Sequence, residues 1–256
     1  MNDETTAAPG GTIAIADKPV SRLGFGTMRL TGPGTWDHPT DPLAAVAVLR
    51  QAIEAGITHI DTADAYGPHT VEELVRTALH PYPDQVLVAT KVGMIRPGPN
   101  IWRPLGRPDY LRAAVEASLR RLATETIGLC YLHRIDPAVP LADQVGELAD
   151  LHKEGKIRAV GLSKVSCAQI EEAARIVPIA AVQNCLNRDE PDDPAVGYCR
   201  DRGIPFVAYR PLNAGALTAD GGRTALRWLL SLGDHVAPIP GTGSPSHLME
   251  LVNAAV

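Results

Sequence analysis

The feature of this chain that most restricts its fold is a regular alternation of short apolar runs with longer amphipathic runs. The apolar runs end at Asp61 and cover 86–91, 127–133, 159–163, 179–184, 205–209 and 236–239. The amphipathic runs cover 43–55, 71–79, 109–122, 141–154, 166–176, 193–202, 224–232 and 246–254. Strands that alternate with helices of about 10–15 residues are typical of parallel βαβ units. The eight amphipathic runs indicate eight such units, which predict an α/β protein whose strands close into a (β/α)8 TIM barrel.

The composition is typical of one domain over residues 1–256, with residues 1–10 as a flexible tail. The hydrophobic content of 45% is enough for a full core. The net charge of −5 gives no reason to expect nucleic acid or an anionic membrane as a partner. No apolar run approaches the roughly 18 residues of a membrane helix, and the first residues lack the features of a signal peptide. We therefore expect a cytoplasmic protein that is a monomer or a weak oligomer.

The four cysteines lie far apart and form no Cys-x-x-Cys pair. Such cysteines are interpreted as thiols in a reducing compartment. We expect neither a disulfide framework nor a metal site.

Polar, titratable residues stand where three successive apolar runs end. Asp61 ends the first run and Tyr66 follows it before a Gly/Pro turn, while Lys91 and His133 end the next two runs. The C-terminal ends of barrel strands form the mouth in which TIM-barrel active sites lie. Taken singly, the four could be a capping acid, a packed tyrosine, a solvated lysine and an interior histidine. Their repetition at strand ends favours one site.

These four residues have the chemistry for reducing a carbonyl group. Reduction adds a hydride to carbon and a proton to oxygen, and the proton donor must lie next to that oxygen. Tyrosine has a pKa near 10, and a neighbouring ammonium stabilises the phenolate. Lys91 supplies that ammonium, Asp61 fixes its position, and His133 can donate a hydrogen bond to the carbonyl. We therefore expect the pKa of Tyr66 to be lowered.

A glycine-rich segment, Gly241-Thr242-Gly243-Ser244, follows the last predicted strand. At this position in a barrel, small residues and the N-terminus of the next helix often bind phosphate. A plain turn is the alternative. The Gly-x-Gly-x-x-Gly turn of the Rossmann fold, the usual competitor for nucleotide binding, is absent from the sequence.

From Leu23 to Asn253, the chain resembles the aldo-keto reductases. The segments that carry the resemblance are 23–28, 56–67 (Gly-Ile-Thr-His-Ile-Asp-Thr-Ala-Asp-Ala-Tyr-Gly), 72–74, 90–91, 132–133, 155–163, 182–184, 208–209 and 238–242. Asp61, Tyr66, Lys91 and His133 resemble the catalytic tetrad of that family. The resemblance implies an oxidoreductase that reduces an aldehyde or ketone, with hydride from NADPH and a proton from Tyr66. NADH is the alternative cofactor.

The resemblance also implies that the cofactor lies across the barrel mouth. The cofactor-binding residues it implies are Gly26, Thr27, Met28, Asp61, Ser163, Lys164, Gln183, Tyr209, Arg210, Pro211, Leu212, Ile239, Gly241, Thr242, Gly243, Ser244, His247 and Glu250. Gln183 would bond the carboxamide and Tyr209 would stack on the nicotinamide ring. Candidate substrate contacts are Trp36 and His38 in the first loop and Trp102, beside Ile101 and Arg103, in the third. Ordinary loop packing is their alternative role.

The chain departs from the family pattern at several cofactor positions. Lys164 stands where Asn is usual, Arg210 where Ser is frequent, and Leu251 where a Glu-Asn pair has its Asn. Gly241 and His247 stand where many members have the basic pair that binds the 2′-phosphate.

Two departures concern length. The segment from Leu212 to Arg223 is short, and the chain stops soon after the last helix. We expect an open site with a weaker grip on the cofactor.

Two other functions fit parts of the sequence. Lys91 on a barrel strand could attack a carbonyl as a Schiff-base aldolase does, but Gln183 and Tyr209 would then have no role. A redox-neutral or non-catalytic barrel that binds a nucleotide would suit the shortened loops but not the intact tetrad.

Overall fold

The computed structural model describes residues 7–220 and 222–256. Its main sheet has eight parallel strands in the order β12-β11-β10-β9-β8-β5-β4-β3. These strands are β3 (Phe25–Gly26), β4 (His59–Asp61), β5 (Leu87–Val92), β8 (Leu129–Leu132), β9 (Val160–Ser163), β10 (Ile179–Cys185), β11 (Phe206–Tyr209) and β12 (Val236–Pro238).

The two edge strands of this sheet meet and close the barrel. The backbone N–H of Gly24 donates to Pro238 O, and that of Gly26 donates to Pro240 O, both at 2.9 Å. These bonds form a seam between β3 and β12. The predicted (β/α)8 fold is confirmed.

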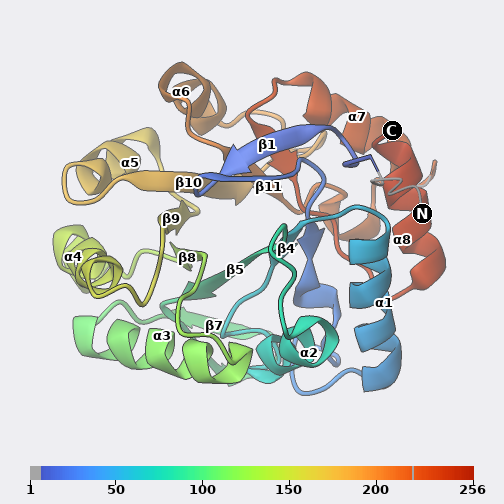
Figure 1. The fold of residues 1–256 in the computed structure, drawn as a ribbon. Helices are drawn as coiled ribbons and strands as arrows, with labels where there is room; N and C mark the ends of the chain where they lie inside the picture. Colours follow the sequence, from blue (N-terminus) through green and yellow to red (C-terminus); the bar gives the residue numbers. More distant parts are fainter. Residues whose placement is uncertain (1–6, 221) are drawn as a thin grey trace.

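Helices surround the strands, as Figure 1 shows. They are α1 (Pro42–Glu54), α2 (Thr70–Leu79), α3 (Pro108–Leu122), α4 (Leu141–Lys153), α5 (Cys167–Ala174), α6 (Pro194–Arg202), α7 (Arg223–Ser231) and α8 (Pro245–Ala254). Local chemistry sets their starts: the Asp41 side chain accepts from Ala44 N at α1, and Ser166 and Gln169 form a capping box at α5. Among the described residues, no helix has both the length and the apolar character needed to cross a membrane.

The strands separate two apolar layers because their side chains alternate between the two faces of the sheet. Ile60 and Phe206 face the helices, whereas Ala89, Ala181 and Val207 fill the barrel interior. Two residues further along the same interior faces, Lys91 and Gln183 follow Ala89 and Ala181 toward the C-terminal ends of β5 and β10.

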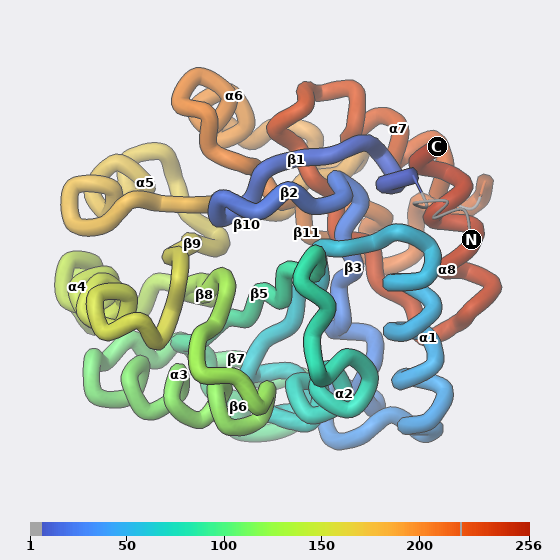
Figure 2. The backbone as a smooth tube through the Cα atoms, viewed as in Figure 1, coloured from blue at the N-terminus to red at the C-terminus, as the bar shows by residue number. Residues whose placement is uncertain are grey.

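An antiparallel hairpin of β1 (Thr12–Ile15) and β2 (Lys18–Ser21) covers the N-terminal end of the barrel. Its side chains Ile13 and Ile15 belong to the interior apolar cluster together with Leu87 and Leu129, at the starts of β5 and β8. Figure 2 shows the hairpin crossing one end of the ring. The periodicity of the sequence did not predict this element.

Two residues of the predicted tail (1–10), Pro9 and Gly10, are bonded to the rest of the protein. Residues 1–6 lie outside the described residues. Gly10 N donates to Ala255 O at 3.1 Å, and Leu23 N donates to Pro9 O at 3.1 Å. These two bonds fix Pro9 and Gly10 to the barrel.

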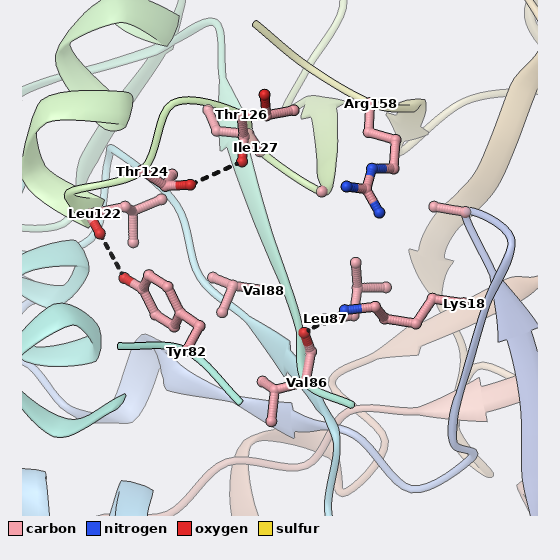
Figure 3. A pocket seen from close by; sticks show the side chains of 12 residues that line it. Lys18, Tyr82, Val86, Leu87, Val88, Leu122, Thr124, Thr126, Ile127 and Arg158 are labelled. Carbon is pink, nitrogen blue, oxygen red and sulfur yellow. Dashed lines mark hydrogen bonds between the residues drawn. The ribbon is translucent and has the colours of Figure 1, made fainter. Parts of the chain in front are cut away.

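A small hollow of about 140 Å³ lies at the same N-terminal end. Figure 3 shows two polar side chains of its wall that bond to backbone carbonyls. The Tyr82 hydroxyl donates to Leu122 O at 2.7 Å, and the Lys18 ammonium donates to Val86 O at 3.0 Å. Arg158 faces the hollow from the opposite wall. This hollow is remote from the strand ends that carry the predicted site.

A second hairpin, β6 (Met94–Gly98) and β7 (Ile101–Pro104), follows β5 at the C-terminal end of the barrel. It replaces the plain loop expected between 91 and 109. Its turn, Pro99-Asn100, includes a residue with φ of 57° at Asn100, a conformation that Asn tolerates well.

Candidate active site

Asp61, Lys91 and Tyr66 form a buried triad at the strand ends. The Lys91 ammonium donates to Asp61 Oδ2 at 2.5 Å, to Thr62 O at 2.9 Å and to the Tyr66 hydroxyl at 3.2 Å. Asp61 and Lys91 are each 1% exposed, so bulk water hardly screens their interaction. The three polar groups that the sequence placed at one mouth are in direct contact.

His133 lies beside this triad. It follows β8 (Leu129–Leu132), and its backbone N–H donates to Val92 O at 2.8 Å. Its ring centroid is 6.0 Å from that of Tyr66. Among the described residues its Nδ1 atom has no hydrogen-bond partner. The imidazole is therefore next to the phenol and borders the mouth.

Asp61 is held from two further sides. The Gln183 side-chain amide donates to Asp61 Oδ1 at 2.7 Å, and the Thr27 hydroxyl donates to Asp61 O at 2.9 Å. The bonds from Gln183 and Lys91 fix the Asp61 carboxylate, and the bond from Thr27 fixes the Asp61 backbone, so the carboxylate orients the ammonium toward Tyr66.

Burial and charge set the protonation states of the triad. Burial opposes the Lys91 ammonium, but Asp61 and Tyr66 outweigh it and raise the pKa of Lys91. Burial raises the pKa of Tyr66 above its usual 10.0, and the Lys91 charge opposes this rise. The net direction for Tyr66 is opposite to the lowering expected from its cationic neighbour alone. At neutral pH the triad therefore holds an ammonium and a protonated phenol.

Burial, followed by the charges of Lys91 and Arg134, lowers the pKa of His133 well below its usual 6.5. The imidazole is neutral at pH 7. One ring nitrogen of a neutral imidazole carries a proton, so His133 can still donate one hydrogen bond.

The mouth opens into a cavity of about 1020 Å³, at the upper end of the roughly 300–1,000 Å³ typical of small-molecule sites. Of the predicted residues, those lining it are Gly26, Met28, Asp61, Tyr66, Trp102, His133, Ser163, Lys164, Gln183, Tyr209, Arg210, Pro211, Leu212, Ile239, Gly241, Thr242, His247 and Glu250. Lys91 lies behind Tyr66 and does not line the cavity. Neither does Thr27, which supports Asp61 from below, nor do Gly243 and Ser244.

The backbone on the seam side of the cavity forms a cradle that fits an extended dinucleotide. A Cβ atom on Gly241 would lie 2.0 Å from Gly26 O, and a Cβ on Gly26 would lie 2.8 Å from Ile239 O. Only glycine permits this close approach, and it leaves bare backbone facing the cavity. The cavity size, this cradle and the ring of Tyr209 agree with the cofactor position that the resemblance implies.

Lys164 and Arg210 share a backbone feature at the edge of the cavity. Their φ angles are 56° and 54°, in the left-handed region that Asn adopts more readily than lysine or arginine. Lys164 therefore adopts a backbone conformation that Asn, the usual residue of the family at this position, would adopt more readily.

The short segment after β11 still reaches across the cavity rim. It contains a 3-10 helix, η2 (Asn213–Gly215), and the Arg29 guanidinium donates to Ala214 O at 3.0 Å. Arg29 lies just after β3, next to the seam. The short segment thus still connects the two sides of the predicted cofactor groove.

Arg96 is a residue of this site that the sequence did not indicate. It is 8% exposed, and its guanidinium donates to Ile101 O, Thr35 O, Ala65 O and Gly34 O at 2.8–3.0 Å. Its Cζ atom lies 3.6 Å from the centroid of the Trp102 ring. Arg96 thus ties the first loop, the Tyr66 turn and the β6–β7 hairpin together. A charged residue among Gly and Pro in a presumed loop gives no sign of such burial.

The three predicted substrate residues have different positions. Trp102 lines the cavity, and its ring is 6.4 Å from that of Tyr66 and 6.2 Å from that of His133. Trp36 and His38 do not line it: Trp36 pairs with Gly67 and lies against Arg96, and His38 is exposed. Thr35 and Asn100 take their place in the cavity wall.

Comparison with known proteins agrees with this arrangement. Residues 22–224 match the model of the aldo/keto reductase family. An uncharacterized oxidoreductase of Schizosaccharomyces pombe is 44% identical over 264 residues, which cover 97% of this chain and 86% of that protein. Pyridoxine 4-dehydrogenase of Escherichia coli is 35% identical over 264 residues, covering 93% and 91%.

Solved structures agree as well. The glycerol dehydrogenase of Gluconobacter oxydans has a TM-score of 0.87 at 28% identity, over 96% of this chain and 90% of that one. An aldo-keto reductase of Bacillus halodurans, solved in its holo form, has a TM-score of 0.82 at 26% identity, over 95% and 90%. The chain therefore belongs to the aldo/keto reductase family of oxidoreductases.

Proposed function

We propose that this protein is an NADPH-dependent carbonyl reductase that converts an aldehyde or ketone into an alcohol, with Tyr66 as the proton donor. The observation that carries the proposal is the contact of Lys91 with both Asp61 and the Tyr66 hydroxyl at the wall of a large cavity.

Each member of the tetrad has a distinct role in this proposal. Tyr66 holds its proton at neutral pH and gives it to the carbonyl oxygen as negative charge develops there. Lys91 stabilises the phenolate that remains, and Asp61 keeps Lys91 charged and oriented. His133 donates a hydrogen bond from its neutral ring to the same oxygen and so fixes the substrate's position.

The residues around the cavity suit a nicotinamide dinucleotide, which supplies the hydride when bound. Tyr209 offers an aromatic face for the ring, and Gln183 and Ser163 line the cavity beside it. The Gly26–Gly241 cradle offers bare backbone to the phosphates. Lys164, Arg210 and Arg29 add positive charge along the groove. We propose NADPH over NADH because these cations can meet an additional phosphate.

A Schiff-base mechanism is disfavoured by the environment of Lys91. Its three donors are engaged by Asp61, Thr62 and Tyr66, and its raised pKa keeps the amine protonated. A nucleophilic lysine needs a free electron pair on nitrogen. The ammonium here is an electrostatic group.

The non-catalytic alternative makes a different prediction about turnover. This alternative explains the cavity and the glycine cradle as a nucleotide-binding site, but it assigns no role to the Tyr66 hydroxyl. A nucleotide-binding protein of that kind would bind NADPH without oxidising it.

The test is reduction of 4-nitrobenzaldehyde and of pyridoxal by the purified protein with NADPH or NADH, followed by absorbance at 340 nm. Pyridoxal is included because one relative is a pyridoxine 4-dehydrogenase. We expect loss of absorbance, formation of the alcohol and a higher rate with NADPH. Binding of NADPH, seen as a rise in melting temperature, without turnover of either aldehyde would favour the non-catalytic alternative.

A further inference from the structure

Arg134 places a guanidinium at the cavity that the reaction described above does not use. It follows His133 directly and lines the cavity. Its Cζ atom lies 5.9 Å from the centroid of the Tyr209 ring, across the mouth. Its Nη1 atom is shielded from solvent and, among the described residues, has no hydrogen-bond partner.

Arg134 is partly exposed, but among the described residues its Nη1 is the one shielded arginine nitrogen without a hydrogen-bond partner. Arg22 and Arg96 donate to backbone carbonyls, and Arg121 pairs with Glu72 at 2.6 Å. Burying a donor of a charged group without a partner is costly. An arginine placed in this way at a binding cavity is best explained by an acceptor that arrives with the ligand.

The strand order places Arg134 at the substrate end of the cavity. β8, which Arg134 follows, is separated from β12 by β9, β10 and β11 in the eight-stranded barrel. It therefore lies on the side opposite the Gly241 loop and its predicted phosphate contacts. Its neighbours are the reacting groups: its charge acts on the pKa of both His133 and Tyr66.

The residues around Arg134 restrict which kind of hydrogen-bond acceptor can pair with it. A guanidinium binds a carboxylate through two parallel hydrogen bonds. Of the carboxylates lining the cavity, Asp61 is engaged by Lys91 and Gln183, and Glu250 lies with the residues of α8. Trp102 adds a flat apolar wall beside His133. The mouth is thus locally positive in a protein whose net charge is −5.

We propose that Arg134 is a specificity-determining residue that binds an anionic oxygen group, a carboxylate in the simplest case, on a flat carbonyl substrate. The substrate class is then an aldehyde or ketone carrying such a group on the same planar framework. This proposal rests on the proposed reductase function.

The test compares aldehydes of the same shape that differ in charge. The probes are 3- and 4-carboxybenzaldehyde and the matching 3- and 4-formylbenzamides. The amide withdraws more electron density from the ring, so intrinsic reactivity favours the neutral member of each pair. We expect kcat/KM to favour at least one carboxylate over its amide by about 10- to 100-fold, the range of a charge-assisted hydrogen bond.

Three variants assign the effect to Arg134. Arg134→Gln should abolish the preference for the carboxylate while turnover of the amide persists, and Arg134→Lys should retain part of it. Lys164→Gln removes a second cation that lines the same cavity, after β9, the strand next to β8. It should alter NADPH affinity and leave the carboxylate-to-amide ratio unchanged.

A binding measurement separates this proposal from the reductase function. Calorimetry with NADP⁺ present should show 4-(hydroxymethyl)benzoate binding to the native protein at least 10-fold tighter than to Arg134→Gln. Equal treatment of acid and amide by the native protein, or an equal loss for both in Arg134→Gln, would overturn the role of Arg134. Absence of turnover for every aldehyde, with benzoate binding intact, would instead count against the reductase function.

Discussion

The two ends of the barrel are each held by one buried arginine, and the difference between them separates stability from chemistry. Arg22 and Arg96 are both 8% exposed. At the N-terminal end, Arg22 donates to Leu230 O at 2.9 Å and to Gly233 O at 2.7 Å, joining the end of the first hairpin to α7 and to the loop before β12. At the mouth, Arg96 joins three loops and lies against Trp102.

A buried arginine that donates to backbone carbonyls serves a different purpose at each end because the segments that it joins differ. The hairpin at the N-terminal end carries Ile13, Ile15 and Val20, whose burial closes the interior. The loops at the mouth carry Tyr66 and Trp102, whose side chains line the cavity. At the N-terminal end, the bonds of Arg22 stabilise the fold. At the mouth, the bonds of Arg96 hold the reacting groups in position.

Among the changes that test this comparison, Tyr66→Phe should have the largest effect on activity. It removes one hydroxyl from the mouth and leaves the packing of the ring intact. We expect kcat to fall by about 10²–10⁴-fold, the usual contribution of general acid catalysis. Stopped-flow or steady-state assays at 340 nm measure the loss, and NADPH titration should show unchanged affinity. Near-normal turnover would remove Tyr66 as the proton donor.

The next test exchanges the two arginines for methionine, one at a time. Arg22→Met should lower the free energy of unfolding by about 2–4 kcal/mol because several carbonyls lose a charged donor, while KM and kcat stay the same. Arg96→Met should lower stability similarly but also raise the substrate KM about 10-fold, since Trp102 loses its support.

Urea unfolding and steady-state kinetics on both variants decide the matter. NADPH affinity serves as the control, because the cofactor groove lies on the other side of the mouth. An unchanged KM in Arg96→Met would make it a structural residue like Arg22.

A smaller effect is expected from pH. Burial, then Lys91 and Arg134, lowers the pKa of His133 well below 6.5 in the folded state. Burial lowers the pKa of His59, deeper in the barrel, to about 4. Below pH 6.5 the unfolded chain takes up protons that the folded chain does not. Each histidine should therefore cost up to about 1.4 kcal/mol of stability per pH unit as the pH falls below 6.5.

The measurement is the free energy of unfolding at pH 7.0, 6.0 and 5.0 for the native protein and for His133→Asn. Other groups titrate in both proteins, so the difference between their slopes isolates His133. Identical slopes would show that this imidazole is protonated as easily in the mouth as in water.

The smallest effect should come from Tyr82→Phe at the N-terminal hollow. It removes the bond from the Tyr82 hydroxyl to Leu122 O and should cost about 0.5–1.5 kcal/mol. Activity should not change, because the hollow is remote from Tyr66. Thermal unfolding and the aldehyde assay together check this, and a drop in kcat would show that the two ends are coupled.

The sequence was sufficient to predict the barrel and the meeting of the tetrad. Parallel strands end at one edge, so Asp61, Lys91 and His133 had to converge once their runs were identified as strands. The predicted lowering of the Tyr66 pKa was wrong. The pKa is raised because the side chain is buried, and the burial of a loop tyrosine depends on its neighbours in space.

The two hairpins and the arginines were not predictable in the same way. The β1–β2 hairpin has only a few alternating residues per strand, too short a period to distinguish from a loop. The Pro-Gly-Pro-Asn stretch before Ile101 was a visible turn signal for the second hairpin. Trp36 does not line the cavity, and its neighbours Thr35 and Asp37 adopt positive φ angles of 53° and 59°, a local conformation that composition does not reveal.

The seam between β3 and β12 has a kinetic consequence. It joins segments from the two ends of the chain: the neighbouring bond from Arg22 to Val236 spans 214 residues. Contacts of such long sequence separation form late, since most of the chain must be ordered before they repay the loss of entropy. The Gly26–Gly241 cradle lies on this seam, so we expect a dinucleotide bound there to stabilise the contact between the two edge strands. Amide hydrogen exchange at Gly24 and Gly26 would then report cofactor binding and barrel closure as one event.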